Sequence, residues 1–371
     1  MLVVLSGGGT AGHINPALAL AEVLVAQGCE VCFAGTPQGV EARLVRQAHI
    51  PFTPFEAAGF NRNHPLSIFK ALYKIEKSTI AAKKWFKKIK PDVVVGFGGY
   101  VSIPVGRAAE SLGIPFVVHE QNSVMGMANK SLSKRAAAVA LTYEIAASSV
   151  AVASKCIVTG NPVRRAVFDS TRAEGRAMLD IPESALVLLV FGGSLGARHI
   201  NAALVALKDR LLAVPDLHIV HITGPKEYDA VGEQLCLTDD EKKRWLVMGY
   251  QDRMGETMAA ADMVVARAGA TSLAEISARR IPALLVPFPY ATEDHQTTNA
   301  KVCVERGAAF MIPDDRVETA GFERMLFELI DKPSVREAMR SAAATFETQD
   351  AAAKLADVVC TAAAVRTNTL Q

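Results

Sequence analysis

Three glycine-rich loops constrain the fold of this chain more than any other feature. Each follows a short apolar run and precedes a helical pattern, at residues 7–12, 96–99 and 192–196. Residues without a Cβ let backbone N–H groups approach a diphosphate closely, and the following helix presents the positive end of its dipole to the anion. Two loops in the first half and one after the middle predict two nucleotide-binding α/β domains that face each other across a cleft.

Strand-like and helix-like segments alternate along both halves of the chain. This alternation is typical of doubly wound parallel sheets, whose ligands bind at the carboxyl ends of the strands. The strands expected in the first half are 2–5, 31–33, 93–95 and 116–118, and those in the second are 186–191, 219–222, 246–248, 263–266 and 283–287. The first helix is expected over 16–27, with Asn15 as its N-cap and Pro16 at its first position.

The length of 371 residues suits two domains of ordinary size. A turn-rich stretch at 160–164 is suited to a linker between them. We therefore expect a first domain over 1–163 and a second over 164–346, with a C-terminal helix at about 347–371 that crosses back over the first domain.

Composition excludes several classes of protein. The six cysteines are sparse and indicate reduced intracellular thiols, and the one CxxC, Cys29 to Cys32, runs into an apolar segment with no second pair downstream. The N-terminus enters a strand at once, without a signal peptide, and no run of about 20 apolar residues could span a membrane. These features predict a cytoplasmic protein.

Motifs for metal and covalent chemistry are missing from the sequence. No two aspartates stand at i and i+2, and there is no zinc spacing, GxSxG elbow or Walker lysine motif. We therefore expect no metal and no cofactor. A bound diphosphate would be neutralised by backbone amides and helix dipoles.

The segment from Arg62 to Lys90 is strongly basic although the net charge of the chain is only +2. It carries one arginine and eight lysines against the single acid Glu76, and apolar and aromatic residues recur at helical spacing between them. This pattern indicates a basic amphipathic helix. It is open to two interpretations, a solvated face above a core stripe or a surface for an anionic membrane; nucleic acid is disfavoured because no recognised binding motif accompanies it.

The first loop, GGGTAGH, can be forced into the GxGxxG spacing of dinucleotide-binding proteins. The second strand, however, ends at Phe33 to Thr36 without an acid to hold a ribose. This absence argues against an oxidoreductase.

Seven motifs together identify a resemblance. They are GGGTAGHINPALALA, GFGGYVSIP, HEQN at 119–122, GNPVR, FGGSLGA, RAGATSLAE and DHQTTNA. In this order, and over nearly the whole chain, they resemble the MurG family, bacterial UDP-N-acetylglucosamine transferases that convert lipid I to lipid II in peptidoglycan synthesis.

The resemblance implies a GT-B fold of two Rossmann-like domains, with the donor held mainly by the second. It further implies an inverting reaction without an essential metal, at the C4 hydroxyl of the muramoyl sugar. The implied partners are UDP-N-acetylglucosamine, undecaprenyl-linked lipid I, the anionic inner leaflet of the plasma membrane, and cell-wall and division proteins. The protein would attach to the membrane peripherally, on the cytoplasmic side.

The resemblance also assigns site residues. The catalytic base is expected at His13, directly after the first loop, and the acceptor pyrophosphate at Gly98, Gly99 and Tyr100. Contacts to the donor are expected from Thr10, Ala11, Gly12, Asn122, Arg164, Ser194, Gln251, Ala270, Thr271, Glu275 and Gln296. Ala11 stands where many members of the family have glycine.

Local chemistry leaves a structural alternative for several of these residues. Glu275 fits a capping box with Ser272 as well as a contact to the ribose hydroxyls, and Ser194 fits a helix N-cap. Asn122 could cap a turn, Arg164 could be an ordinary surface arginine, and His13 could orient the acceptor without taking its proton.

Three rival functions remain. A UDP-N-acetylglucosamine 2-epimerase or another glycosyltransferase would share the fold, but a wholly soluble epimerase has no use for the basic segment. A dinucleotide oxidoreductase would bind a nicotinamide. A nucleotide-binding scaffold of the division machinery would bind without turnover.

Overall fold

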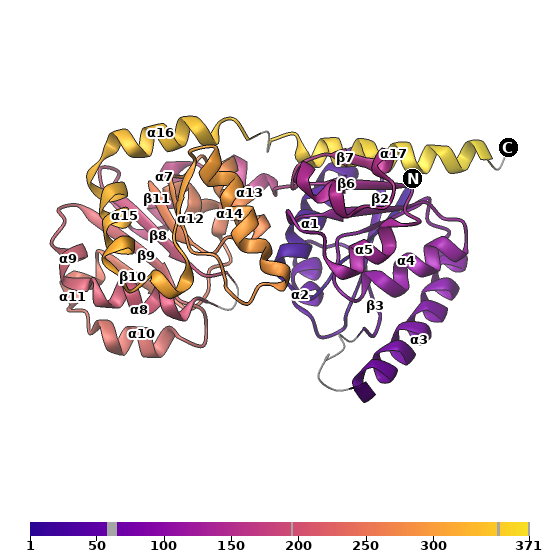
Figure 1. Ribbon diagram of the computed structural model, residues 1–371, viewed down its shortest axis with the longest axis horizontal. Coiled ribbons are helices and arrows are strands. Elements are labelled where there is room, and N and C mark those ends of the chain that lie inside the picture. Colours follow the sequence, from indigo (N-terminus) through magenta and orange to yellow (C-terminus); the bar gives the residue numbers. More distant parts are fainter. Residues whose placement is uncertain (58–64, 194–195, 347–348, 370–371) are drawn as a thin grey trace. The chain divides into compact units, whose positions relative to one another are not determined.

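The computed structural model describes residues 1–57, 65–193, 196–346 and 349–369 (Figure 1). The chain divides into two compact units, one formed by Met1–Arg164 with the segment from Thr348 to the C-terminus, the other by Arg165–Glu347. Within the described ranges, no helix is both long and apolar enough to cross a membrane.

The first unit is built on a parallel sheet in the order β3-β2-β1-β4-β5-β6-β7. Its strands are β1 (Leu2–Ser6), β2 (Glu30–Gly35), β3 (Phe52–Pro54), β4 (Val93–Gly96), β5 (Phe116–Glu120), β6 (Ala138–Leu141) and β7 (Cys156–Val158). The order reverses between β1 and β4, which pair in parallel with Val3 beside Val93. Ligands of doubly wound sheets bind at the carboxyl end of such a reversal.

Helices cover both faces of this sheet because successive strand residues point to opposite sides. The helices are α1 (Ala11–Ala26), α2 (Val40–Gln47), α3 (Pro65–Ile89), α4 (Ser102–Ser111), α5 (Met127–Ser133) and α17 (Ala351–Thr369). Val3 and Leu5 enter a core with α1, α2 and α17, whereas Val4 enters one with α3, α4 and α5. In Figure 1, α17 runs in yellow along this unit.

The start of α1 differs from the expectation. The helix begins at Ala11 with Thr10 as its N-cap, so Asn15 is not the cap and Pro16 lies inside the helix. Pro16 is the sixth helical residue, so it lacks the N–H that would bond to the carbonyl of Gly12, and its ring crowds that carbonyl. The first glycine loop therefore runs directly into the helix.

The second unit repeats the plan with the sheet order β10-β9-β8-β11-β12-β13. Its strands are β8 (Leu186–Phe191), β9 (Leu217–Ile222), β10 (Trp245–Met248), β11 (Met263–Ala266), β12 (Ala283–Leu285) and β13 (Ala309–Met311). The order reverses between β8 and β11, where Leu188 pairs with Met263.

Helices also cover both faces of the second sheet. They are α6 (Arg165–Asp169), α7 (Arg172–Leu179), α8 (Arg198–Ala206), α9 (Lys208–Leu212), α10 (Tyr228–Leu235), α11 (Asp239–Lys242), α12 (Met254–Ala260), α13 (Ala270–Ala278), α14 (His295–Glu305), α15 (Ala320–Asp331) and α16 (Pro333–Ala343). Leu188 and Val190 pack with α8, α10, α15 and α16. Val187 and Leu189 pack with α7, α12, α13 and α14.

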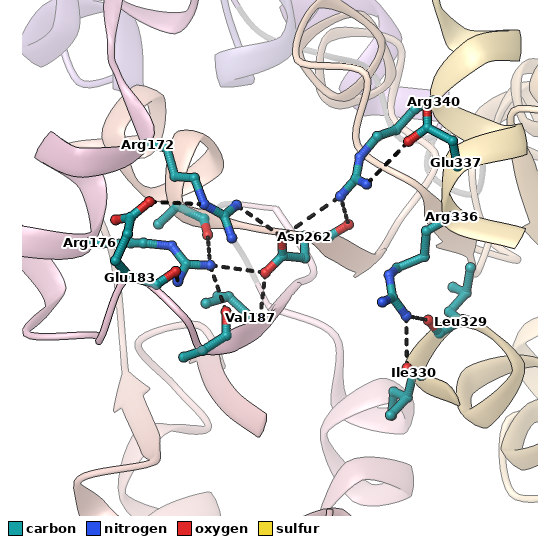
Figure 2. A network of polar contacts seen from close by, with 12 residues as sticks. Arg172, Arg176, Glu183, Val187, Asp262, Leu329, Ile330, Arg336, Glu337 and Arg340 are labelled. Atoms are coloured by element: carbon teal, nitrogen blue, oxygen red, sulfur yellow. Dashed lines mark hydrogen bonds and ion pairs between the residues drawn. The ribbon is translucent and has the colours of Figure 1, made fainter. Parts of the chain in front are cut away.

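An ionic network closes the amino end of this second sheet (Figure 2). Asp262, directly before β11, binds Arg172 and Arg176 at 2.9 and 3.0 Å and lies 3.7 Å from Arg340 of α16. The same carboxylate accepts the amide of Val187 in β8 at 2.8 Å. One buried acid thus ties helices from both ends of the unit to two central strands.

Both sheets are parallel wherever strand pairs are described, with helices on each face. The predicted fold class of two Rossmann-like domains is confirmed.

Candidate active site

The site residues of the first unit follow three adjacent strands. The loop after β1 leads to His13, the loop after β4 carries Gly98, Gly99 and Tyr100, and the loop after β5 carries Asn122. Because β1, β4 and β5 are neighbours in one parallel sheet, their carboxyl ends lie at the same edge. The fold therefore gathers these residues where a doubly wound sheet binds its ligand.

His13 has one ring nitrogen engaged by the backbone. Its Nδ1 lies 2.8 Å from the carbonyl oxygen of Gly8, which can only accept a hydrogen bond. A neutral His13 in this arrangement carries its proton on Nδ1, so Nε2 is left as the acceptor. This is the form that a general base requires.

The second glycine loop is shaped around the ring of His13. Gly98 has φ of +102°, and a Cβ placed on it would lie 3.2 Å from Nε2 of His13 and 3.5 Å from Nδ2 of Asn129. A side chain at position 98 would crowd this part of the imidazole. The catalytic and acceptor residues expected from the sequence are thus in close proximity.

Asn122 is oriented by a buried glutamate. Glu120, 1% exposed, accepts the backbone amide and Nδ2 of Asn122 at 3.0 and 3.2 Å. Its other oxygen accepts the amide of Gly126 and Nδ2 of Asn129 at 3.0 and 2.8 Å. Four donors to one carboxylate thus tie Asn122, Gly126 and Asn129 together.

The remaining residues of the first unit lie at helix ends. Thr10 caps α1 without using its hydroxyl for the cap, and Ala11 and Gly12 are the first two helical residues. A right-handed helical position accepts alanine readily, so the methyl group of Ala11 is compatible with the loop. Arg164, at the end of the first part of this unit, pairs with Glu22 of α1 at 3.2 Å.

The site residues of the second unit also follow adjacent strands. The third glycine loop follows β8, Ala270 and Thr271 begin α13 after β11, and Gln296 is the second residue of α14 after β12. Gln251 follows a different strand, β10, at the edge of the sheet. Ser194 lies outside the described residues.

The position of Glu275 excludes the capping box that its spacing suggested. The N-cap of α13 is Gly269, so Ser272 is the third residue of the helix and not its cap. Glu275 lies further inside the helix and is 9% exposed. Ser272 is therefore not the N-cap that a capping box with Glu275 requires.

The two glutamines have their side-chain oxygens engaged. Oε1 of Gln296 accepts the amides of Ala268 and Phe288 at 3.1 and 2.9 Å, so it ties the loop after β11 to the loop after β12. Its Nε2 is a hydrogen-bond donor. Oε1 of Gln251 accepts the amide of Arg253 at 2.9 Å.

Sequence reasoning missed two acids of the first unit. Glu120 lies inside the HEQN motif, where its position at the end of an apolar strand was the available signal. Glu41 is fully buried in α2 beside the first glycine loop, and nothing in its local sequence marks it. Among the described residues, no group of three or more histidines, cysteines or acids is arranged to hold a metal ion.

Comparisons with known proteins match both units. The glycosyltransferase family 28 N-terminal domain matches residues 3–141, and the glycosyltransferase family 28 C-terminal domain matches residues 187–355.

The similar proteins cover nearly the full chain. The UDP-N-acetylglucosamine–N-acetylmuramyl-(pentapeptide) pyrophosphoryl-undecaprenol N-acetylglucosamine transferase of Halothermothrix orenii is 40% identical over 89% of this chain and 91% of its own. The transferase of the same name from Desulfitobacterium hafniense (strain DSM 10664 / DCB-2) is 39% identical over 96% and 98%. The crystal structure of Acinetobacter baumannii MurG, 30% identical, has a TM-score of 0.74 and covers 97% of this chain and 99% of that chain.

Proposed function

This chain belongs to the MurG family of glycosyltransferases, and we propose how its two units divide the family's reaction. The enzyme transfers N-acetylglucosamine from UDP-N-acetylglucosamine to lipid I and forms lipid II for peptidoglycan. The observation that carries this conclusion is the 40% identity to a transferase of that name along 89% of the chain. It supports the transferase over the rival functions of epimerase, oxidoreductase and scaffold.

In the proposed reaction, the C4 hydroxyl of the muramoyl sugar attacks the anomeric carbon of the donor. A bond forms from that oxygen to the carbon on the face opposite UDP, so the centre inverts. The bond from the carbon to the phosphate oxygen breaks, and UDP leaves with the electron pair. The hydroxyl proton passes to Nε2 of His13, which the hydrogen bond from Nδ1 to Gly8 leaves as acceptor.

The first unit is proposed to hold the acceptor. Gly98, Gly99 and Tyr100 form the turn that precedes α4, next to His13. Backbone amides in such a turn suit a pyrophosphate. Thr10, Ala11, Gly12, Asn122 and Arg164 are proposed to contact the donor from this unit.

The second unit is proposed to hold most of the donor. The start of α13 at Ala270 and Thr271 offers N–H groups, and Ser194 in the third loop offers a hydroxyl to the diphosphate. Glu275 accepts from the ribose hydroxyls, Gln296 donates from Nε2 to the sugar, and Gln251 lies next to the uracil, which backbone groups contact. No metal or cofactor is required in this arrangement.

We also propose that α3 attaches the enzyme to the anionic cytoplasmic face of the plasma membrane. Leu72, Tyr73 and Ile80 are 52, 69 and 50% exposed. Lys77, Lys84 and Lys87 are exposed at helical spacing from Tyr73 and Ile80. The buried stripe of the helix consists of other residues, Ile75, Ala82 and Phe86. The exposed apolar side chains are therefore available to lipid.

Incubation with UDP-N-acetylglucosamine and a short-chain lipid I analogue tests the function. Mass analysis should find the acceptor heavier by one N-acetylhexosamine, with one UDP released per transfer. Formation of UDP-N-acetylmannosamine, or of free N-acetylmannosamine and UDP, without the acceptor would instead indicate an epimerase. An unchanged acceptor would contradict transferase activity.

A further inference from the structure

A buried carboxylate lies behind the first glycine loop. Glu41 of α2 is fully buried, and its Oε1 accepts both the backbone amide of Thr36, at 3.0 Å, and the Thr36 hydroxyl. Its Oε2 lies 3.4 Å from the amide of Gly9, a long hydrogen bond. Burial of a carboxylate is costly unless donors surround it, so this arrangement demands a specific local structure.

The glycine loop is built to admit this carboxylate. A Cβ on Gly8 would lie 2.6 Å from Oε1 of Glu41 and 3.0 Å from Cγ1 of Val101. Any larger residue at position 8 would displace the carboxylate or the loop. The glycine therefore serves the contact to Glu41 in addition to any contact with a ligand.

Glu41 and His13 form hydrogen bonds to the same peptide group. Glu41 accepts from the N–H of this peptide, and the carbonyl oxygen of the peptide accepts from Nδ1–H of His13. That peptide joins Gly8 to Gly9: its N–H points to Oε2 of Glu41, and its carbonyl oxygen lies 2.8 Å from Nδ1 of His13. The N–H and C=O of a trans peptide point in opposite directions. One planar unit thus connects a buried negative charge to the imidazole.

We infer that Glu41 is a positioning residue for the catalytic histidine and acts through the Gly8–Gly9 peptide. The carboxylate orients and polarises this peptide, whose carbonyl then holds the proton of His13 on Nδ1. Nε2 is thereby kept as the proton acceptor. A carboxylate that contacts the histidine directly does the same in serine hydrolases.

The inference rests on the proposed role of His13 as base, but its central element can be measured without turnover. Nitrogen-15 NMR of the full-length protein distinguishes protonated from unprotonated ring nitrogens, and a His13→Asn variant identifies the signals of His13 among the eight histidines. In the wild type, neutral His13 should show a protonated Nδ1 and an unprotonated Nε2.

Glu41→Gln is the decisive variant, because it keeps the size of the side chain and removes its charge. His13 should then populate both tautomers, and kcat should fall by about 10- to 100-fold, the range found when a group that orients a metal-bound histidine is lost. KM for UDP-N-acetylglucosamine should stay within about twofold, since this loss affects the base more than the donor.

Asp92→Asn is the control, an exposed carboxylate of the same unit. Asp92 also accepts a backbone amide, that of Leu2 at 2.7 Å, but lies directly before β4 at the opposite end of the sheet. This variant should leave both the tautomer and kcat as in the wild type. An effect on both equal to that of Glu41→Gln would overturn the inference.

The possible failures separate from one another. Glu41→Gln with a single Nδ1-protonated tautomer overturns the inference, whether the variant is less stable or less active. Wild-type turnover of His13→Asn would overturn the assignment of the base. Even if His13 is not the base, a mixture of His13 tautomers in Glu41→Gln would support the action of Glu41 through the Gly8–Gly9 peptide.

Discussion

At the scale of single residues, hydrogen bonds within the chain determine which side-chain atoms are left to contact the proposed substrates. His13 keeps Nε2 because Gly8 engages Nδ1, and Gln296 keeps Nε2 because two amides engage its oxygen. In each case a backbone group settles an ambiguity of the side chain itself. The proposed chemistry depends on these atoms.

Substitution of His13 tests the proton transfer. His13→Ala should lower kcat by about 10² to 10⁴, the usual range for a lost general base, with little change in donor affinity. His13→Asn should be similarly slow, because its amide can donate to Gly8 but cannot take a proton. Turnover numbers with a lipid I analogue measure this. Near wild-type kcat for the asparagine variant would mean that another group is the base.

Substitution of Glu275 tests donor recognition. Glu275→Gln should weaken UDP-N-acetylglucosamine binding by roughly 1.5 to 3 kcal/mol, because a charge-assisted hydrogen bond is lost in a buried place. Titration calorimetry measures the change. Glu328→Gln on α15, where Glu328 pairs with Lys332, is the control. Unchanged donor affinity, with a lower melting temperature, would assign Glu275 a structural role.

At the scale of elements, α3 combines two surfaces on one helix. Its inner residues fill the core of the first unit, and its outer face alternates lysines with exposed apolar side chains. The pattern of the sequence indicated an amphipathic helix, but the exposed face became clear only from the packing. This face carries the proposed membrane contact.

Charge reversal on α3 tests that contact. Lys84→Glu with Lys88→Glu should weaken binding to anionic vesicles by at least about 2 kcal/mol, because each cation near the surface contributes about 1 kcal/mol. Co-sedimentation at low and high salt measures the binding. Lys242→Glu with Lys243→Glu, at the end of α11 and directly after it, should have little effect. Equal binding of the wild type to neutral and anionic vesicles would contradict the proposal.

The second element to be tested is the network around Asp262 (Figure 2). Asp262→Asn should reduce the free energy of unfolding of the second unit by about 3 to 5 kcal/mol, because it leaves the buried Arg176 without its counter-charge. Urea denaturation measures this. Glu337→Gln, which removes an exposed partner of Arg340, should cost less than about 1 kcal/mol. Equal losses of unfolding free energy in the two variants would contradict the prediction that the buried ion pair matters more than the exposed one.

At the scale of the whole molecule, each sheet contains a buried histidine. Burial lowers the pKa of His119 in β5 to about 4, although its bond to the Gly160 carbonyl opposes the shift. Burial likewise lowers the pKa of His221 in β9 to about 4. His221 donates from Nε2 to Asn201 at 2.9 Å, as a neutral ring can.

Both units should therefore lose stability in mild acid. Unfolded histidine binds a proton near pH 6.5 while these two do not until about pH 4, so the unfolded state binds more protons in this window. Stability is fully present above pH 6.5 and falls as the pH is lowered towards 4, by up to about 3 kcal/mol per histidine. Urea midpoints at pH 7.5 and 5 measure this.

His221→Gln provides the control for this titration. The second unit of this variant should have a lower free energy of unfolding at neutral pH than the wild type. This free energy should also change less with pH, because one titrating group is gone. An unfolding free energy of the wild type that does not change between pH 7 and 5 would contradict the prediction.

The sequence by itself determined the two parallel sheets, the places of the glycine loops and the family. These features depend on local patterns: β8 and β11 coincide with the apolar runs at 186–191 and 263–266, and each glycine loop adjoins its own strand. The same local reasoning misplaced the start of α1, because the proline rule favoured Pro16 over a helix that begins at Ala11.

Only the tertiary structure decided which distant residues act together. Glu41 reaches Gly9 across 32 residues, and Asp262 joins Arg176 across 86. It also placed Ser272 inside α13, which separated Glu275 from a capping role. Hydrogen bonds and ion pairs between distant segments depend on the packing of whole sheets and helices, and no periodicity along the chain encodes them.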